Sequence, residues 1–160
     1  MNTKSYPPLE IKENQEAAWS LAEARANIFA KYLSHYLGNV FSYKEPAVHV
    51  GLRATVDAFK HKYKLYFRVT QPGKGLFDEK TLVIARINFH SQRKGHGTRL
   101  LSYLTEIASH VGYSKIGIEA TNNNSQAFGK KLGFQQHGEG NDMLASVENL
   151  RMKLATLGAK

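Results

Sequence analysis

The chain contains no cysteine, and this absence removes several kinds of chemistry at once. Without a thiol there is no disulfide, no cysteine nucleophile and no cysteine-ligated zinc site. The seven histidines show no His-Glu-x-x-His spacing, so we expect no metal site. The Gly-x-Ser-x-Gly turn that presents a nucleophilic serine is also missing, which leaves serine hydrolysis without support.

Long hydrophobic runs are missing too. No apolar run approaches the ~20 residues that span a bilayer, and residues 1–12 lack the apolar centre of a secretory signal. We therefore expect a cytoplasmic protein with no membrane partner. The chain shows no obvious linker, internal repeat or low-complexity segment, and its 160 residues suffice for one core of ordinary size. We predict a single domain over residues 1–160.

Acidic residues are scarce, 13 against 22 lysines and arginines, and the net charge is +9. Residues 51–100 carry most of the excess, with 11 basic and 3 acidic residues. Within them, the alternation of residues 59–69 predicts one half-buried strand with a basic outer face. That face is either a solvated edge protected by lysines or a surface for a nucleic acid or another acidic partner. Its members are Lys60, Lys62, Lys64, Tyr66 and Arg68.

Glycines gather in one loop, where they favour the binding of phosphate. The segment Gln92-Arg93-Lys94-Gly95-His96-Gly97-Thr98 lies between a strand-like run over residues 81–89 and a helix-like run over residues 98–111. The first amides of a helix have no partner inside the helix and carry partial positive charge, so an anion satisfies both. The spacing is neither that of a nucleotide-triphosphatase loop nor that of a dinucleotide loop. It predicts a phosphate-bearing cofactor, and the alternative is a tight turn in which the glycines serve geometry only.

A second motif follows about twenty residues later. Residues 115–120 read as a short buried strand, and the polar cluster Asn122-Asn123-Asn124-Ser125 supplies N-cap side chains for a helix over residues 126–132. Gly133 fits the C-terminal stop of this helix. The order strand, cap, short helix and glycine is therefore predicted from local signals alone.

The two motifs together resemble those of the GNAT N-acetyltransferase superfamily. Gln-x-x-Gly-x-Gly resembles its acyl-coenzyme A loop, and Lys131-Leu132-Gly133-Phe134 with Asn122 upstream resembles its second cofactor motif. The resemblance covers about residues 80–155. It implies an α/β layered fold, with a mixed, mostly antiparallel sheet flanked by helices and a splayed parallel strand pair at the cofactor site.

The same resemblance implies the ligand and its contacts. Acetyl-coenzyme A is the expected co-substrate, with its pantetheine arm against strand backbone around Ile87 and Phe89. Its phosphates are expected on residues 92–98, and Asn122 is expected beside it. The expected reaction is transfer of acetyl to a primary amine, on a small molecule or a protein. The sequence does not identify that acceptor, and a homodimer is left open.

Catalytic residues are harder to assign. Glu119, at the end of the second motif's strand, is our first candidate for the general base, and His90 is the second. Each has a plainer interpretation, Glu119 as a solvated or paired carboxylate and His90 as a turn histidine. The superfamily often has a tyrosine acid four residues before Gly133, where this chain has Gly129. Tyr103, water, or no efficient turnover are the alternatives, so a catalytically weak or inactive module that binds coenzyme A or nucleic acid stays open.

The remaining elements are predicted from periodicity. Asn14 is expected to cap a helix that runs to Leu37 and stops at Gly38. Residues 48–53 and 146–154 are expected to be strands, and residues 71–75 and 138–142 to be turns. The face of the first helix expected to meet the core comprises Ala17, Leu21, Ala24, Ile28, Tyr32 and Tyr36.

Overall fold

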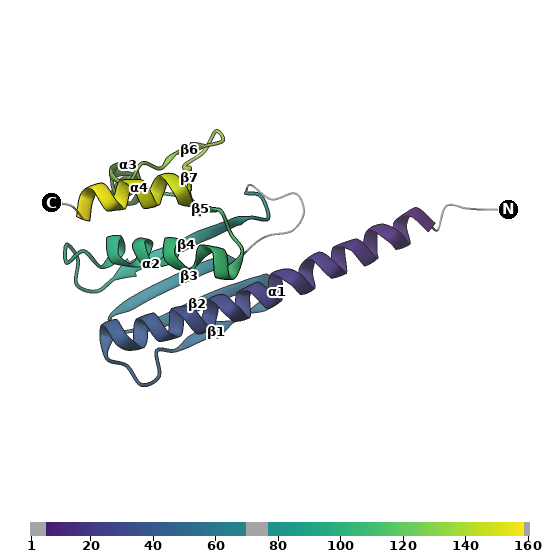
Figure 1. The fold of residues 1–160 in the computed structure, drawn as a ribbon, viewed down its shortest axis with the longest axis horizontal. Helices are drawn as coiled ribbons and strands as arrows, with labels where there is room; N and C mark the ends of the chain where they lie inside the picture. The colour runs from purple at the N-terminus through teal and green to yellow at the C-terminus, as the bar shows by residue number, and fades with distance from the viewer. Residues whose placement is uncertain (1–5, 70–76, 159–160) are drawn as a thin grey trace.

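A computed structural model describes the backbone of residues 6–69 and 77–158, and side chains from residue 15 onward. Within these residues the chain forms a mixed α/β fold with one sheet of seven strands, in the order β1-β2-β3-β4-β5-β7-β6 (Figure 1). The strands are β1 (Val48–Val50), β2 (Thr55–Lys60), β3 (Tyr63–Val69), β4 (Thr81–Phe89), β5 (Lys115–Ile118), β6 (Gln135–His137) and β7 (Asp142–Ser146). The helices are α1 (Tyr6–Phe41), α2 (His96–Val111), α3 (Asn123–Lys131) and α4 (Val147–Gly158), with a short 3₁₀ turn η1 (Leu52–Ala54). None of the described helices has the length and apolarity needed to cross a membrane.

The sheet is antiparallel except where a helix intervenes. β4 and β5 pair in parallel, from Thr81 beside Lys115 to Ile84 beside Ile118. This pairing needs a crossover connection, and α2 supplies it. The predicted mixed, mostly antiparallel sheet is therefore confirmed, as are the strand over residues 81–89 and the helix that follows the loop.

Helices α1, α2 and α4 lie side by side over one face of the sheet (Figure 1). The ring of Phe29 on α1 meets that of Phe67 on β3 edge-on, with centroids 4.9 Å apart, and Phe41 lies 5.2 Å from Tyr63. Burial of these large rings is the main favourable term holding α1 to the sheet. On the opposite side of β3, Lys64 is exposed.

The first helix differs from the prediction in length and in its buried face. It begins at Tyr6 and continues through Gly38 to Phe41. Gly38 does not end the helix. Instead, the backbone of Tyr43 approaches it closely, and a Cβ at this position would lie 3.1 Å from the carbonyl oxygen of Tyr43. The helix carries two apolar stripes with helical spacing, and the sheet takes the one with the larger side chains. Of the face that we expected to meet the core, Tyr32 and Tyr36 are partly buried against it, whereas the four members nearer the N-terminus are exposed. The buried stripe is Ala22, Ala26, Phe29, Leu33 and Leu37.

Residues 59–69 form a hairpin rather than one strand. β2 ends at Lys60 and β3 begins at Tyr63, so His61 and Lys62 form the turn. Lys60 and Tyr63 pair across this turn and share a face of the sheet, so the buried positions change from even-numbered residues on β2 to odd-numbered residues on β3. The exposed Phe59 (46%) continues the odd-numbered apolar pattern into β2, and the sequence pattern therefore hides the turn. The turn divides the predicted basic face. Lys60 and Lys62 lie over the ring of Tyr43, at 5.0 and 5.5 Å from its centroid, while the other members lie on β3.

The predicted strand over residues 146–154 is also wrong. Residues from Val147 onward form α4, with Val147, Leu150 and Leu154 buried at helical spacing and Met152 64% exposed. Over so short a segment, the spacing of the apolar residues around Leu150, Met152 and Leu154 fits both the two-residue period of a strand and the 3.6-residue period of a helix. The strand predicted from residue 48 ends at Val50. The turn over 138–142 is confirmed as the β6–β7 connection, and the one over 71–75 lies outside the described residues.

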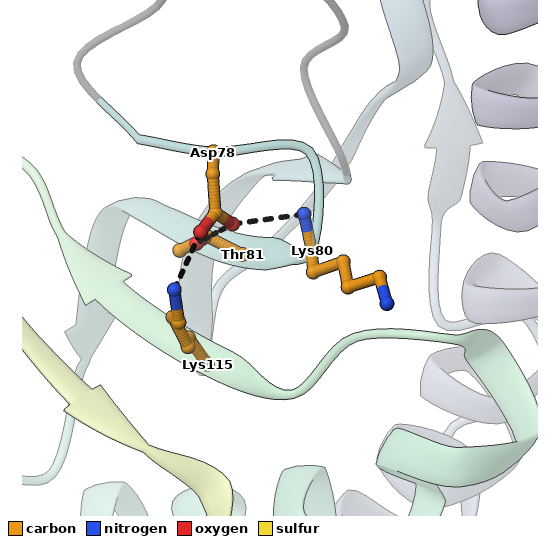
Figure 2. Close-up of polar contacts among 4 residues, drawn as sticks. All are labelled: Asp78, Lys80, Thr81 and Lys115. Atoms are coloured by element: carbon orange, nitrogen blue, oxygen red, sulfur yellow. Dashed lines mark hydrogen bonds and ion pairs between the residues drawn. The ribbon is translucent and has the colours of Figure 1, made fainter.

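Asp78 ties the starts of β4 and β5 together (Figure 2). Its Oδ1 accepts hydrogen bonds from the amide of Lys80 (2.9 Å) and the hydroxyl of Thr81 (2.8 Å), and its Oδ2 lies 2.5 Å from Nζ of Lys115. The hydrogen bond from Lys115, supported by those from Thr81 and Lys80, holds the pKa of Asp78 below its ordinary value despite partial burial. The carboxylate is thus stabilised by folding.

Replacing Asp78 by Asn is expected to lower the free energy of unfolding by about 1 kcal/mol at pH 7, the scale of one lost hydrogen-bonding partner. Because the pKa of Asp78 is lowered on folding, its contribution is present above the unfolded pKa of about 3.9 and is lost as the pH falls through the folded value. Urea unfolding at pH 7 and at pH 3 measures this. Glu79→Gln, at the exposed neighbouring carboxylate, is the control. If the free energies of unfolding of Asp78→Asn and the parent differed as much at pH 3 as at pH 7, the account would be contradicted.

Candidate functional site

The parallel strands β4 and β5 separate at a defined point. Their pairing ends at Ile84 and Ile118, after which the amide of Glu119 donates to the carbonyl of Ile84 (3.0 Å). The β3–β4 register shifts at the same place, because Tyr66 faces Arg86 while Phe67 faces Ile84, which leaves Ala85 as an extra residue. Such a bulge bends the strand that carries it. β4 therefore continues to Phe89 with a described strand, β3, on one side only.

That free edge has the properties of a binding strand. An unpaired strand edge presents alternating N–H and C=O groups, which an extended ligand containing amides matches. Ile87 is half-buried on this stretch and Phe89 is buried, with its ring 5.9 Å from that of Phe41. The core thus holds the strand in place while its edge faces away from β3.

The glycine loop ends in an uncapped helix N-terminus. Gly95 occupies the N-cap position of α2 with φ +78°, and no side chain of the described residues caps this helix. The left-handed conformation is one that glycine adopts without strain. The amide of Arg99 donates to the carbonyl of Gly95 (3.0 Å), so the amides of His96, Gly97 and Thr98 precede the first helical hydrogen bond. Three amides and the positive end of the helix dipole therefore face whatever binds the loop.

The side chains of the loop divide into two groups. Gln92, Arg93 and Lys94 are exposed and free to meet an anion in solvent. His96 instead packs inward, with its ring centroid 5.0 Å from Phe41 and 5.3 Å from Phe89. This burial, together with the nearby charges of Arg99 and Lys94, lowers the pKa of His96. The His96 side chain therefore anchors the loop to the core, and the backbone amide of His96 is the group that stays available to a ligand.

Arg99 and Gly97 fix the loop to its surroundings. Nη2 of Arg99 donates to the carbonyl of Lys94 (2.9 Å) and lies 3.2 Å from Nδ1 of His96. A Cβ on Gly97 would lie 3.1 Å from Cζ of Phe128 on α3. Gly97 thus permits close packing between α2 and α3, and this packing brings the two sequence motifs together in space.

Asn122 caps the second of these helices. Its Oδ1 accepts from the amide of Ser125 (3.0 Å), while Oγ of Ser125 accepts from the amide of Asn122 (2.8 Å). This reciprocal capping box satisfies two otherwise unpaired amides. The predicted cap and the glycine stop at Gly133, which has φ +90°, are both confirmed. The Asn122 side chain is therefore already engaged, and a role beside the cofactor remains a proposal.

The two candidate bases lie far apart. Glu119 lies where β4 and β5 separate, and Nε of Arg68 donates to its Oε2 at 3.1 Å. His90 follows the far end of β4, about 20 Å further along the strand at 3.3 Å per residue. Its ring lies 4.4 Å from that of His61 in the hairpin turn. Only Glu119 is next to the strand separation, so the structure does not bring the two candidates together.

The position of the missing tyrosine faces the core. Gly129 is buried, and a Cβ there would lie 2.8 Å from Sδ of Met143 and 3.4 Å from Cβ of Phe134. Tyr103 is not placed to substitute, because its hydroxyl donates to the carbonyl of Tyr32 on α1 (2.8 Å). Burial raises the pKa of Tyr103, which further opposes ionisation there. Neither position presents a hydroxyl to the separated strands.

Arg68 is a site residue that sequence reasoning did not single out as the partner of Glu119. The two are separated by 51 positions, and their ion pair holds the pKa of Arg68 above its ordinary value. The only sequence signal was the alternation that placed Arg68 on the outer face of its strand. Among the described residues, no group of three or more histidine, aspartate or glutamate side chains is arranged to hold a metal ion.

A separated parallel strand pair beside an uncapped, glycine-entered helix is the arrangement that the resemblance led us to expect. The family comparison agrees: residues 65–134 match the model of the Acetyltransferase (GNAT) family. That segment runs from β3 to Phe134 and contains both motifs and both candidate bases. The family match therefore supports the resemblance over residues 65–134, which are fewer than half of the chain's 160 residues.

Solved structures give likenesses at low identity. A Tetrahymena GCN5 structure is 18% identical, covers 72% of this chain and 86% of that one, and has a TM-score of 0.44. An AtaT mutant toxin bound to the C-terminus of the antitoxin AtaR and acetyl-CoA is 16% identical, covers 57% of this chain and 62% of that one, and has a TM-score of 0.45. An archaeal Methanocaldococcus infernus Elp3 structure is 17% identical, covers 69% of this chain and 33% of that one, and has a TM-score of 0.48. These likenesses carry no functional argument, and no curated protein matches the chain.

Proposed function

We propose that residues 1–160 form one acetyl-coenzyme A-dependent N-acetyltransferase domain. The observation that carries this proposal is the uncapped N-terminus of α2, entered through Gly95, beside the free edge of β4. A coenzyme A molecule has a pyrophosphate for the first feature and an amide-containing pantetheine arm for the second. The family match over residues 65–134 supports the same assignment.

Each part of the site has a role in this proposal. The amides of residues 96–98 bind the pyrophosphate, and Gln92, Arg93 and Lys94 supply further donors and charge. The backbone of β4 around Ile87 and Phe89 pairs with the pantetheine arm, which directs the thioester toward the point where the strands separate. In this proposal Asn122, the N-cap residue of α3, also lies beside the coenzyme.

The chemistry requires proton transfer near that point. An amine attacks the thioester carbonyl only when neutral, so a base must accept its proton as the carbon–nitrogen bond forms and the carbon–sulfur bond breaks. Glu119 is our proposed base because it lies at the strand separation. His90, which lies near the loop rather than the separation, is the weaker candidate.

Replacing Glu119 by Gln is expected to reduce kcat by about 100-fold or more, the scale of one lost general base. The matched control is Arg68→Gln, which removes the other half of the ion pair but keeps the carboxylate. If Glu119 were only an ion-pair partner, the two variants would lose activity to the same extent. A loss confined to Glu119→Gln supports the assignment.

The chain makes the activity assay unusually direct. Because it contains no cysteine, coenzyme A released during turnover is the only thiol in the reaction. Thiol release from acetyl-coenzyme A, measured against a panel of polyamines and lysine-containing peptides, tests the proposal. Release that rises with an amine acceptor and is lost in Glu119→Gln supports it, whereas background release with every acceptor contradicts the enzymatic proposal.

A second candidate is a module that binds coenzyme A or nucleic acid without efficient turnover. The specific observation in its favour is that neither of the two positions considered for the acid offers a free hydroxyl, since Gly129 faces Met143 and the Tyr103 hydroxyl donates to a carbonyl of α1. Nucleic-acid binding would show an affinity that falls steeply with salt. It would be lost on joint replacement of Lys60, Lys62 and Lys64.

A further inference from the structure

Helix α1 carries a second apolar stripe that the sheet does not cover. Its members, Ala17, Leu21, Ala24 and Ile28, recur at helical spacing and are exposed, with Leu21 at 54% and Ile28 at 40%. The helix is 36 residues long, about 54 Å at 1.5 Å per residue. Figure 1 shows its N-terminal part extending away from the sheet. A regular apolar stripe on such a helix is typical of a helix-pairing surface.

Charge is distributed unevenly along the same helix. Within the part of the helix whose side chains the structure describes, residues 15–24 carry two glutamates and no basic residue, whereas residues 25–41 carry one arginine, one lysine and no acidic residue. The helix dipole does not account for this uneven charge, because α1 has no acidic residue in its first turn and no basic residue in its last turn. The two halves of the helix therefore have opposite net charge. When two copies of the helix pack antiparallel, the acidic half of each lies beside the basic half of the other.

The basic half also borders a cleft. This cleft lies between the outer side of α1, at Lys31, Ser34 and His35, and the segment that follows the helix, at Tyr43 and Lys44. Gly38 permits that segment to fold back, since it lies close to the carbonyl of Tyr43. The residues that line the cleft include no aspartate or glutamate. The surface is therefore suited to an acidic helix rather than a basic one.

We propose that a second copy of this chain packs antiparallel along α1. A two-fold axis near Ala24 brings Leu21 beside Ile28 of the partner subunit, with small alanines between them that let the helices approach. The same axis brings Glu16 beside Lys31 of the partner subunit, because both residues lie on the same flank of the stripe at 3.6 residues per turn. The contact is isologous, so it closes as a dimer and each interaction occurs twice. It is independent of the proposed function.

Sedimentation velocity over a range of concentrations tests the stripe. The parent chain is expected to approach twice its mass of 17.9 kDa as concentration rises, and Leu21→Glu with Ile28→Glu to stay at 17.9 kDa. Both side chains are exposed, so the fold persists, which circular dichroism checks. Met152→Glu, at a more exposed apolar residue on α4, is the control and is expected to dimerise as the parent does. A parent chain that is monomeric at every concentration would overturn the proposal.

A charge exchange tests the antiparallel arrangement. Glu16→Lys alone and Lys31→Glu alone are each expected to weaken the dimer about fivefold, since each disrupts two symmetry-related pairs of ordinary surface strength. The double variant re-forms both pairs with reversed sign and is expected to regain most of the parent's affinity. A double variant that dimerises no better than either single one would overturn the antiparallel register.

Discussion

Arg93→Glu combined with Lys94→Glu is expected to weaken acetyl-coenzyme A binding by about 100-fold, or roughly 2.7 kcal/mol. Both side chains are exposed at the loop that precedes the uncapped N-terminus of α2. Charge-assisted hydrogen bonds to phosphate each contribute about 1.5–3 kcal/mol, and reversed charges repel the phosphate rather than merely failing to bind it. Isothermal titration with acetyl-coenzyme A measures the change.

The control for this prediction makes the same change in net charge at two positions away from the loop. Lys64→Glu with Lys153→Glu reverses two exposed cations on β3 and α4. If the loop binds the coenzyme directly, this control loses little affinity. Equal losses in the two double variants would show that only the overall charge matters, and the loop would then lose its assigned role.

Restoring a tyrosine at position 129 is expected to destabilise the protein and not to raise turnover. A Cβ at Gly129 already meets Sδ of Met143 at 2.8 Å, and the ring of a tyrosine is far larger. Overfilling a packed core costs typically 1–3 kcal/mol, of which replacing glycine in a helix returns up to about 1 kcal/mol. We expect a net loss of about 2 kcal/mol in the free energy of unfolding, measured by urea denaturation.

Two companions make this test specific. Ala127→Tyr places the same side chain on an exposed position of α3 and is expected to change stability by less than about 0.5 kcal/mol. Met143→Ala combined with Gly129→Tyr is expected to show favourable coupling, because the ring then fills space that the methionine vacates. A Gly129→Tyr variant with parental stability and raised kcat would mean that this position faces the thioester instead of the core.

Local signals predicted residues 81–133 well. The glycines of the loop, the asparagine–serine cap and the glycine after Leu132 each act within a few residues, so the sequence carries them directly. The strand over residues 81–89 and the helix after the loop followed from the same kind of evidence. The confirmed elements are thus those whose boundaries depend on nearby residues.

The errors arose where a sequence pattern fits two structures equally well and only tertiary packing determines which one forms. α1 has two apolar stripes, and only the presence of the sheet selects the one with Phe29, Leu33 and Leu37. Alternation over residues 59–69 concealed a turn at His61 and Lys62, and alternation near Leu150 concealed α4. Periodicity over short segments does not resolve these cases.

The site was predicted in its backbone and only partly in its side chains. Residues 92–98 were identified because a helix N-terminus with glycines is a local feature. The bulge at Ala85, the pairing of Arg68 with Glu119 and the inward packing of His96 all depend on residues distant in sequence. The sequence therefore predicted the backbone of the proposed cofactor site more fully than the side-chain contacts around it.

The most direct test of the central claim is isothermal titration of the parent protein with acetyl-coenzyme A, using desulfo-coenzyme A and ATP as comparisons. Saturable binding of acetyl-coenzyme A and of desulfo-coenzyme A, with little binding of ATP, is the predicted result, because the site recognises the pantetheine arm as well as the phosphates. Absence of binding would show that the glycine loop is only a turn between β4 and α2, and would contradict the account.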